Sequence, residues 1–221
     1  MKKLPADLIS LASVLGLVLL IVLWYAELPD PMPSHWNVKG EVDGTMDKNT
    51  NIAMLVGLPL FCWGLMKVIP LISPKGFRTD EFSETVNVMQ VALVVFMSAI
   101  GVAVMLEARN FGLDMTNYVI IAVGGLLIVL GNYLGKVRKN FFIGIRTPWT
   151  LASDEVWSKT HRLGGWMFVL AGIILALSGV FGINEAVMAS TIVIAAVIPI
   201  VYSFILYRRI EGFGPDEDSS S

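Results

Sequence analysis

The sequence predicts an all-α membrane protein, a bundle of six transmembrane helices with both termini in the cytoplasm. Hydrophobic residues make up 55% of the 221 residues and charged residues only 15%, against about 25% charged in an ordinary soluble domain. Six uncharged runs are long enough to cross a bilayer, and the basic residues gather on one side of these runs. An ordinary soluble globular domain is excluded, because a core of this size could not bury so many apolar side chains.

The six uncharged runs are bounded by charged residues or turns. Each has close to the roughly 20 apolar residues that a helix needs to cross a bilayer core of about 30 Å. They cover residues 8–26, 49–66, 85–106, 115–135, 163–184 and 186–207. The second run ends at Lys67, whose aliphatic stem can reach the interface while the apolar sequence continues to Ile72. We therefore expect six membrane-spanning helices.

Lysine and arginine residues indicate the orientation, because cytoplasmic loops are enriched in them. In the six-span arrangement, Lys39, Lys48 and Arg109 lie on the side away from the termini, and the other thirteen basic residues lie on the side of the termini. This bias places both termini in the cytoplasm. Residues 211–221 are acidic and rich in serine, so we expect a disordered tail there.

The sequence divides into four parts. We expect an N-terminal module at residues 1–72, central spans at 73–131, a C-terminal module at 132–210 and the tail at 211–221. Two connections are long, the external one from Glu27 to Asn51 and the cytoplasmic one from Lys136 to Arg162. Long ordered loops in a compact bundle are usually functional.

The external loop is predicted to form a compact cap. It begins with a stretch that enforces an extended chain, at Pro29, Pro31 and Pro33. Asp43 and Gly44 form a strong turn dipeptide. His35 and Asp43 could share a metal ion or bind a polar ligand group. Local geometry alone favours the alternative, in which His35 and Trp36 lie at the headgroups while Asn37 and Asp43 close their own turns.

The cytoplasmic loop mixes aromatic and basic residues, which are Phe141, Phe142, Trp149 and Trp157 among Arg138, Lys139, Arg146 and Lys159. Anchoring to anionic lipid and docking of a protein partner explain this mixture about equally well. Ser153 followed by Asp154 and Glu155 is typical of a helix start. That helix can run directly into the fifth span.

Ionisable residues are almost absent from the spans, with Lys67 near the inner interface as the exception, which counts against an ion-coupled transporter. Asn87, Gln90 and Asn132 could line a cavity for a small molecule or a lipid, but interhelical hydrogen bonding is the favoured interpretation. Glycines on the fourth and fifth spans favour close helix packing, at Gly131, Gly135, Gly172 and Gly179.

An enzyme is not expected, and no cofactor is implied. The two histidines, His35 outside and His161 inside, are predicted to lie a bilayer apart. The sequence has no HExxH string, nucleophile elbow, P-loop or glycine-rich dinucleotide turn. A metal-dependent membrane enzyme centred on His35, with Asp43 as a second candidate ligand, is the weakest alternative.

At its two long loops the sequence resembles the SdpI family of bacterial immunity membrane proteins. The external string His35-Trp36-Asn37, with Gly40 and Asp43, is similar to the N-terminal domain of unknown function in that family. The region from Asn132 to the sixth span is similar to the C-terminal module of the family. The residues that carry this second similarity are Asn140, Gly144, Arg146, Thr147, Pro148, Trp149, Thr150, Leu151, Trp157, Thr160, His161 and Arg162.

The resemblance implies protection of the cell against a secreted toxic peptide or protein, and signalling in which a transcriptional repressor is held at the membrane. The implied partners are an extracellular toxin, a cytoplasmic repressor and membrane lipid, with no direct contact to nucleic acid. It implies a toxin-recognition surface at His35, Trp36, Asn37, Gly40 and Asp43. We expect Asn140, Arg146, Thr147, Pro148, Trp149 and Trp157 to shape a cytoplasmic loop that serves either the output partner or the closed bundle.

Overall fold

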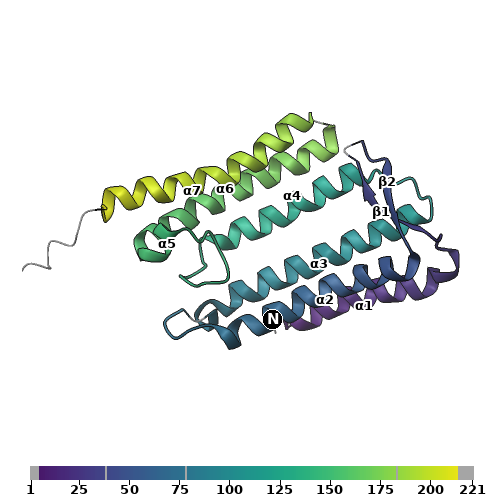
Figure 1. Ribbon diagram of the computed structural model, residues 1–221, viewed down its shortest axis with the longest axis horizontal. Coiled ribbons are helices and arrows are strands. Elements are labelled where there is room, and N and C mark those ends of the chain that lie inside the picture. The colour runs from purple at the N-terminus through teal and green to yellow at the C-terminus, as the bar shows by residue number, and fades with distance from the viewer. Residues whose placement is uncertain (1–4, 38, 78, 183, 214–221) are drawn as a thin grey trace, which may run out of the picture.

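The computed structural model describes residues 5–37, 39–77, 79–182 and 184–213, and its fold is mostly helical (Figure 1). Six helices are long and apolar enough to cross a membrane. They are α1 (Ala6–Trp24), α2 (Lys48–Ile72), α3 (Ser83–Ala108), α4 (Met115–Leu134), α6 (Asp154–Phe181) and α7 (Glu185–Ile210). The prediction of six spans is confirmed, and the chain is a multi-pass membrane protein.

Shorter elements connect the spans at both ends of the bundle. The 3-10 helix η1 (Tyr25–Glu27) extends α1, and η2 (Thr79–Phe82) precedes α3. The five-residue helix α5 (Pro148–Ala152) lies before α6. The predicted tail falls mostly outside the described residues, as do Lys2, Lys3 and Arg78 among the basic residues used for the orientation.

The spans form two groups of three. Helices α1 and α2 pack on α3, whereas α6 packs on both α4 and α7, and the two groups meet where α3 contacts α4. Figure 1 shows the first group on one side of the bundle and the second on the other. Apolar side chains buried between α1, α3 and the start of α4 form a core at one end, built around Leu17, Met32 and Met105.

The external loop forms a β-hairpin, which is a difference from the all-α prediction. Strand β1 (Met32–Trp36) pairs antiparallel with β2 (Val42–Met46), and His35 lies opposite Gly44. Strand β1 contacts both α2 and α3. The proline-rich stretch favours an extended chain, and Asn37 and Gly40 close the turn of this two-stranded cap. The predicted turn at Asp43 and Gly44 is wrong, because both residues lie within β2.

Helices α4 and α6 pack with their backbones in close contact, as the glycine pattern predicts. A β-carbon at Gly131 would lie 2.7 Å from the Gly165 carbonyl oxygen, and one at Gly124 would lie 2.6 Å from the Gly172 carbonyl oxygen. Because these neighbours are backbone atoms, they cannot move aside as a side chain can. Glycine is therefore required for this close helix crossing.

Helix α6 begins at Asp154, and the side chain of Ser153 accepts a hydrogen bond from the Val156 N–H at 3.4 Å. The predicted helix start is confirmed, and α6 does continue into the fifth span.

Of the polar residues considered for a transport cavity, Asn132 lies on α4, apart from Asn87 and Gln90 on α3, and Asn87 lines an open groove of about 420 Å³ between α1 and α3. Gln90 is 1% exposed and donates hydrogen bonds to Asp7 (3.1 Å) and Ser10 (3.2 Å) on α1. Asn132 donates to the carbonyl oxygen of Ile128 in its own helix. For Gln90 the favoured interpretation, interhelical hydrogen bonding, is confirmed.

Candidate functional sites at the two ends of the bundle

The β-hairpin presents an exposed pair of titratable residues. The His35 Nδ1 atom lies 2.5 Å from the Asp43 Oδ1 atom, and the two side chains are 72% and 45% exposed. A β-carbon at Gly44 would lie 2.9 Å from the β-carbon of His35. The small residue opposite His35 therefore leaves room for this pair, and water reaches both of its members.

The hairpin turn is closed by Asn37. Its Oδ1 atom accepts hydrogen bonds from the N–H groups of Lys39 (2.9 Å) and Glu41 (3.1 Å), and its Nδ2 atom donates to the Glu41 carboxylate. Gly40 has φ +79°, a conformation that glycine adopts most readily. Asn37 and Gly40 thus shape the turn.

Trp36 lies beside an open groove of about 590 Å³ between the hairpin, α4 and α7. Its lining is mostly apolar and includes Met115, Val119, Met188 and Ile192. The indole N–H of Trp36 has no hydrogen-bond acceptor among the described residues. The hairpin therefore offers a polar pair at its exposed surface and an apolar groove at its side.

Electrostatics at the base of the hairpin favour an ordered start of α2. The Asp47 carboxylate accepts a hydrogen bond from the Thr50 N–H at 2.9 Å, and hydrogen bonds from Thr50 hold the pKa of Asp47 below its usual range. Within the parts of the chain that the structure describes, no three metal-binding side chains gather in one place. His35 and Asp43 thus form a two-residue pair.

At the other end of the bundle, Asn140 organises the loop that is predicted to be cytoplasmic. The Asn140 side chain is completely buried, and its Nδ2 atom donates to the carbonyl oxygens of Arg138 (2.8 Å) and Ile143 (3.0 Å). Its Oδ1 atom accepts from the N–H groups of Phe142 (2.8 Å) and Ile143 (2.7 Å). One side chain therefore satisfies four backbone groups and fixes the turn.

His161 attaches this turn to α6. The completely buried imidazole accepts a hydrogen bond from the Ile145 N–H at its Nε2 atom (2.9 Å), while its Nδ1 atom lies 2.8 Å from the Trp157 carbonyl oxygen. These contacts assign a neutral ring with the proton on Nδ1. The Trp157 ring stacks on His161 with 4.0 Å between the centroids, and its indole N–H donates to the Val137 carbonyl oxygen (2.8 Å).

The threonines of the loop form a second attachment. Thr147 and Thr150 cap α5 reciprocally, the Thr150 hydroxyl donates to the Ile145 carbonyl oxygen (2.8 Å), and the Thr147 hydroxyl lies 3.1 Å from that of Ser203 on α7. Pro148 occupies the first turn of α5, where its missing N–H costs nothing. This network joins the loop, α5 and α7.

Two larger side chains of the loop are more accessible. Arg146 is exposed and donates a hydrogen bond to the Phe141 carbonyl oxygen. Trp149 is partly buried and contacts Phe204 edge-to-face with 5.0 Å between the centroids. The predicted loop residues are therefore brought together, with Asn140, Thr147 and Trp157 inside and Arg146 and Pro148 outside.

Sequence reasoning did not place His161 in this site, although it recognised the string Thr160-His161-Arg162. A signal for it existed, because Trp157 and His161 are four residues apart and so share one helix face. The turn at Gly144, which packs against this helix face, is distant in the sequence, so the sequence did not indicate the contact.

Comparisons with known proteins match two separate parts of the chain to family models. Residues 136–203 match the SdpI/YfhL protein family, and residues 12–60 match a domain of unknown function (DUF1648). The chain is 24% identical over 214 residues to "Immunity protein SdpI" of Bacillus subtilis (strain 168). The aligned region covers 96% of this chain and 99% of that protein. No solved structure matches the chain. The predicted relationship to the SdpI family is confirmed.

Proposed function

We propose that this membrane protein is an immunity protein that protects its cell against a secreted toxic peptide or protein. The similarity to an immunity protein over 96% of the chain carries the proposal, because it includes both the hairpin and the cytoplasmic loop. The chain is an SdpI-family membrane protein with six spans. That family relationship, together with the absence of catalytic motifs from the sequence, supports a binding function rather than catalysis.

The proposal includes the orientation and the division of the chain. With six spans the start of α1 and the end of α7 would share one side, and the presence of thirteen of the sixteen Lys and Arg residues on that side supports a cytoplasmic location for it. The hairpin then faces outward. Residues 1–72 would act as the receptor module, 73–131 as the connecting spans and 132–210 as the output module.

The hairpin is the proposed toxin-recognition surface. His35 and Asp43 are exposed and can exchange their mutual contact for contacts to a ligand, and Trp36 offers a large apolar surface at the edge of the groove. Asn37 and Gly40 contribute by fixing the turn that presents these side chains. The apolar groove beside a polar pair fits an amphipathic peptide better than a small ion.

The cytoplasmic loop is the proposed output surface, where a transcriptional repressor would be held at the membrane. Its buried residues keep one conformation, while Arg146, Pro148 and Phe141 are exposed on it. A small-molecule transporter finds less support. Gln90 is used in packing α3 against α1, and Asn132 lies on α4, in the other group of three helices.

A deletion experiment tests the proposed function. Cells that lack the gene should become sensitive to the cognate secreted toxin while their uptake of solutes stays unchanged, and the intact gene should restore resistance. Changed solute uptake without changed sensitivity would favour a transporter. Purified protein that retains stoichiometric metal would favour the enzyme alternative.

Cysteine labelling tests the orientation in a Cys62→Ser background, since Cys62 is the one cysteine of the sequence. Ser34 lies on the hairpin and Ser158 near the start of α6, and both are exposed. A membrane-impermeant thiol reagent should label Ser34→Cys in intact cells and Ser158→Cys only after lysis. The reverse pattern would overturn the orientation.

A further inference from the structure

Arg162 is an exposed cation in the N-terminal part of α6. It has no hydrogen bond or ion pair to any residue that the structure describes, whereas nearby Lys159 is paired with Glu155 at 2.5 Å. Arg162 lies at the end of α4, because a β-carbon at Gly135 would be 3.6 Å from the Arg162 Cα atom. The Arg162 backbone therefore lies beside the end of the α4 span, on the side of the chain termini.

A groove of about 200 Å³ lies beside this arginine, between α4 and α6, and is lined by Gly131, Asn132, Gly135, Arg162, Gly165, Trp166 and Val169. The Asn132 amide donates one hydrogen to the Ile128 carbonyl oxygen at 2.9 Å, and its second hydrogen has no acceptor within the described part of the chain. The groove thus offers a guanidinium fork and an amide donor, and its lining includes no carboxylate.

An apolar surface continues from the groove along α6. Trp166 is 73% exposed, and further exposed side chains follow it at helical spacing, at Leu170, Ile173, Leu177 and Val180. Positions 162 and 166 are one turn apart, so that Arg162 stands at the polar end of this row. A charged head followed by an exposed apolar row matches the shape of a phospholipid.

We propose that this groove binds one phospholipid of net negative charge, with its phosphate at Arg162 and Asn132 and an acyl chain along the α6 row. A guanidinium group can hold two phosphate oxygens at once, which an ammonium group does not. The groove is smaller than the roughly 300 to 1,000 Å³ of typical ligand sites, so it holds only the phosphate and glycerol portions. A headgroup with its own cation is disfavoured beside the unpaired Arg162.

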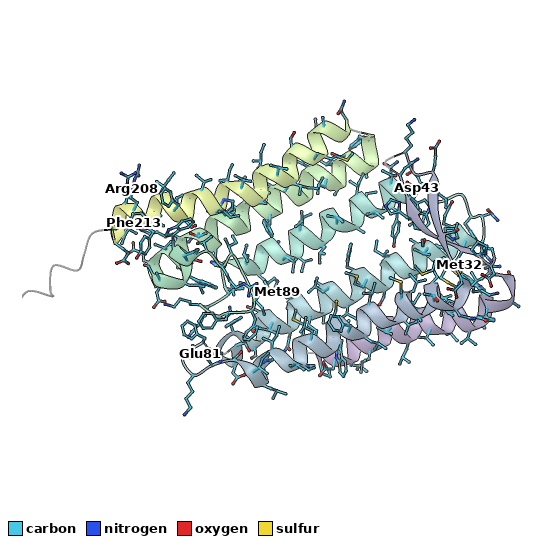
Figure 2. The ribbon with its side chains drawn as sticks, in the orientation of Figure 1. Met32, Asp43, Glu81, Met89, Arg208 and Phe213 are labelled. Carbon is cyan, nitrogen blue, oxygen red and sulfur yellow. The ribbon has the colours of Figure 1, made fainter. Side chains whose placement is uncertain are left out.

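This site is separate from the proposed toxin-recognition surface, since it lies at the opposite end of the bundle from the hairpin. Figure 2 shows Asp43 of the hairpin at one end and Arg208 at the other. Arg208, in the last turn of α7, is an exposed arginine on the side of the termini that is not among the residues lining the groove. Its substitution is therefore a matched control for the loss of one positive charge.

Native mass spectrometry of the full chain in detergent tests the proposal, with phosphatidylglycerol as the probe and phosphatidylcholine as the reference lipid. We expect one phosphatidylglycerol to be retained in preference to phosphatidylcholine. Arg162→Gln should weaken its binding about tenfold, Arg162→Lys should restore only part of it, and Arg208→Gln should leave it unchanged. Thermal denaturation without added lipid should show the same midpoint for all variants.

Three results would overturn the proposal. Equal losses in Arg162→Gln and Arg208→Gln would show that total charge attracts the lipid without a site. Unchanged binding in Arg162→Gln would place the lipid elsewhere. Displacement of the lipid by millimolar inorganic phosphate would show that the groove takes a free anion.

Discussion

The backbone of Gly144 lies directly against the imidazole of His161. Gly144 has φ +117°, and a β-carbon on it would overlap the Nε2 atom of His161. That same Nε2 atom accepts the hydrogen bond from the Ile145 N–H at 2.9 Å. The cytoplasmic loop can therefore close on α6 only because residue 144 has no side chain.

Gly144→Ala is expected to open this contact and destabilise the protein. The substitution forces a strained backbone conformation, which costs about 1 to 3 kcal/mol, and it displaces the ring that accepts the Ile145 N–H. The midpoint of thermal denaturation in detergent should fall clearly. Gly76→Ala is the matched control, since Gly76 has φ +86° but open space around it. An equal fall in both variants would show that backbone strain alone, and not the contact with His161, is responsible.

Gly131→Ala is expected to separate α4 from α6. Its new methyl group would lie 2.7 Å from the Gly165 carbonyl oxygen and 2.8 Å from the Val169 nitrogen. Overpacking of this kind typically costs about 1 to 3 kcal/mol, so both abundance in the membrane and thermal stability should decrease. Gly125→Ala, on the same helix with nothing within 4 Å, should behave as wild type. A stable Gly131→Ala protein would contradict the close helix crossing.

The sequence predicts the spans well because hydropathy and length determine them. The hairpin could not be predicted in the same way, because it depends on how two strands pair. This pairing has a register that puts His35 opposite Gly44. The sequence around either residue does not indicate that register. The helix start at Ser153 was predictable because capping and charge are local. Close packing between α4 and α6 was predictable, since glycines on both helices favour it. The specific pairing of Gly131 with Gly165 could not be predicted, because it depends on how the two helices are positioned relative to each other.

His35→Ala and Asp43→Ala are each expected to reduce protection against the toxin while the protein reaches the membrane in normal amounts. Both side chains are exposed, so the fold does not depend on them, and loss of a central interface contact commonly weakens binding more than about tenfold. Survival at graded toxin concentrations measures the effect. Lys39→Ala, on the exposed turn of the same hairpin, should protect fully. Full protection by the two test variants would exclude this pair from recognition.

The cytoplasmic site was only partly predictable. The proline after Thr147 indicates a turn, and the aromatic and basic composition indicates a membrane-proximal surface. The division into buried and exposed residues could not be read from composition, because Asn140 and Thr147 are polar residues that the fold buries against backbone groups and Ser203. Burial of this kind depends on the return of α6 and α7 beside the loop.

A pair of substitutions can separate the structural role of the loop from its proposed output role. Thr147→Val keeps the shape of the side chain but removes the hydroxyl that caps α5 and faces Ser203 at 3.1 Å. The unsatisfied groups that remain should cost about 1 to 3 kcal/mol. We expect thermal stability and recruitment of the repressor to membrane fractions to fall together in this variant.

Arg146→Lys should reduce recruitment alone. Arg146 is exposed, and its contact within the loop is a hydrogen bond to the Phe141 carbonyl oxygen, which a lysine can replace. A lysine cannot reproduce the two-pronged contact of a guanidinium group with a carboxylate on a partner. Co-sedimentation of the repressor with membranes should therefore decrease while abundance and the denaturation midpoint stay at wild-type values. If Arg146→Lys instead lowers stability and recruitment together, as Thr147→Val does, Arg146 is a structural brace and the output surface lies elsewhere on the cytoplasmic face.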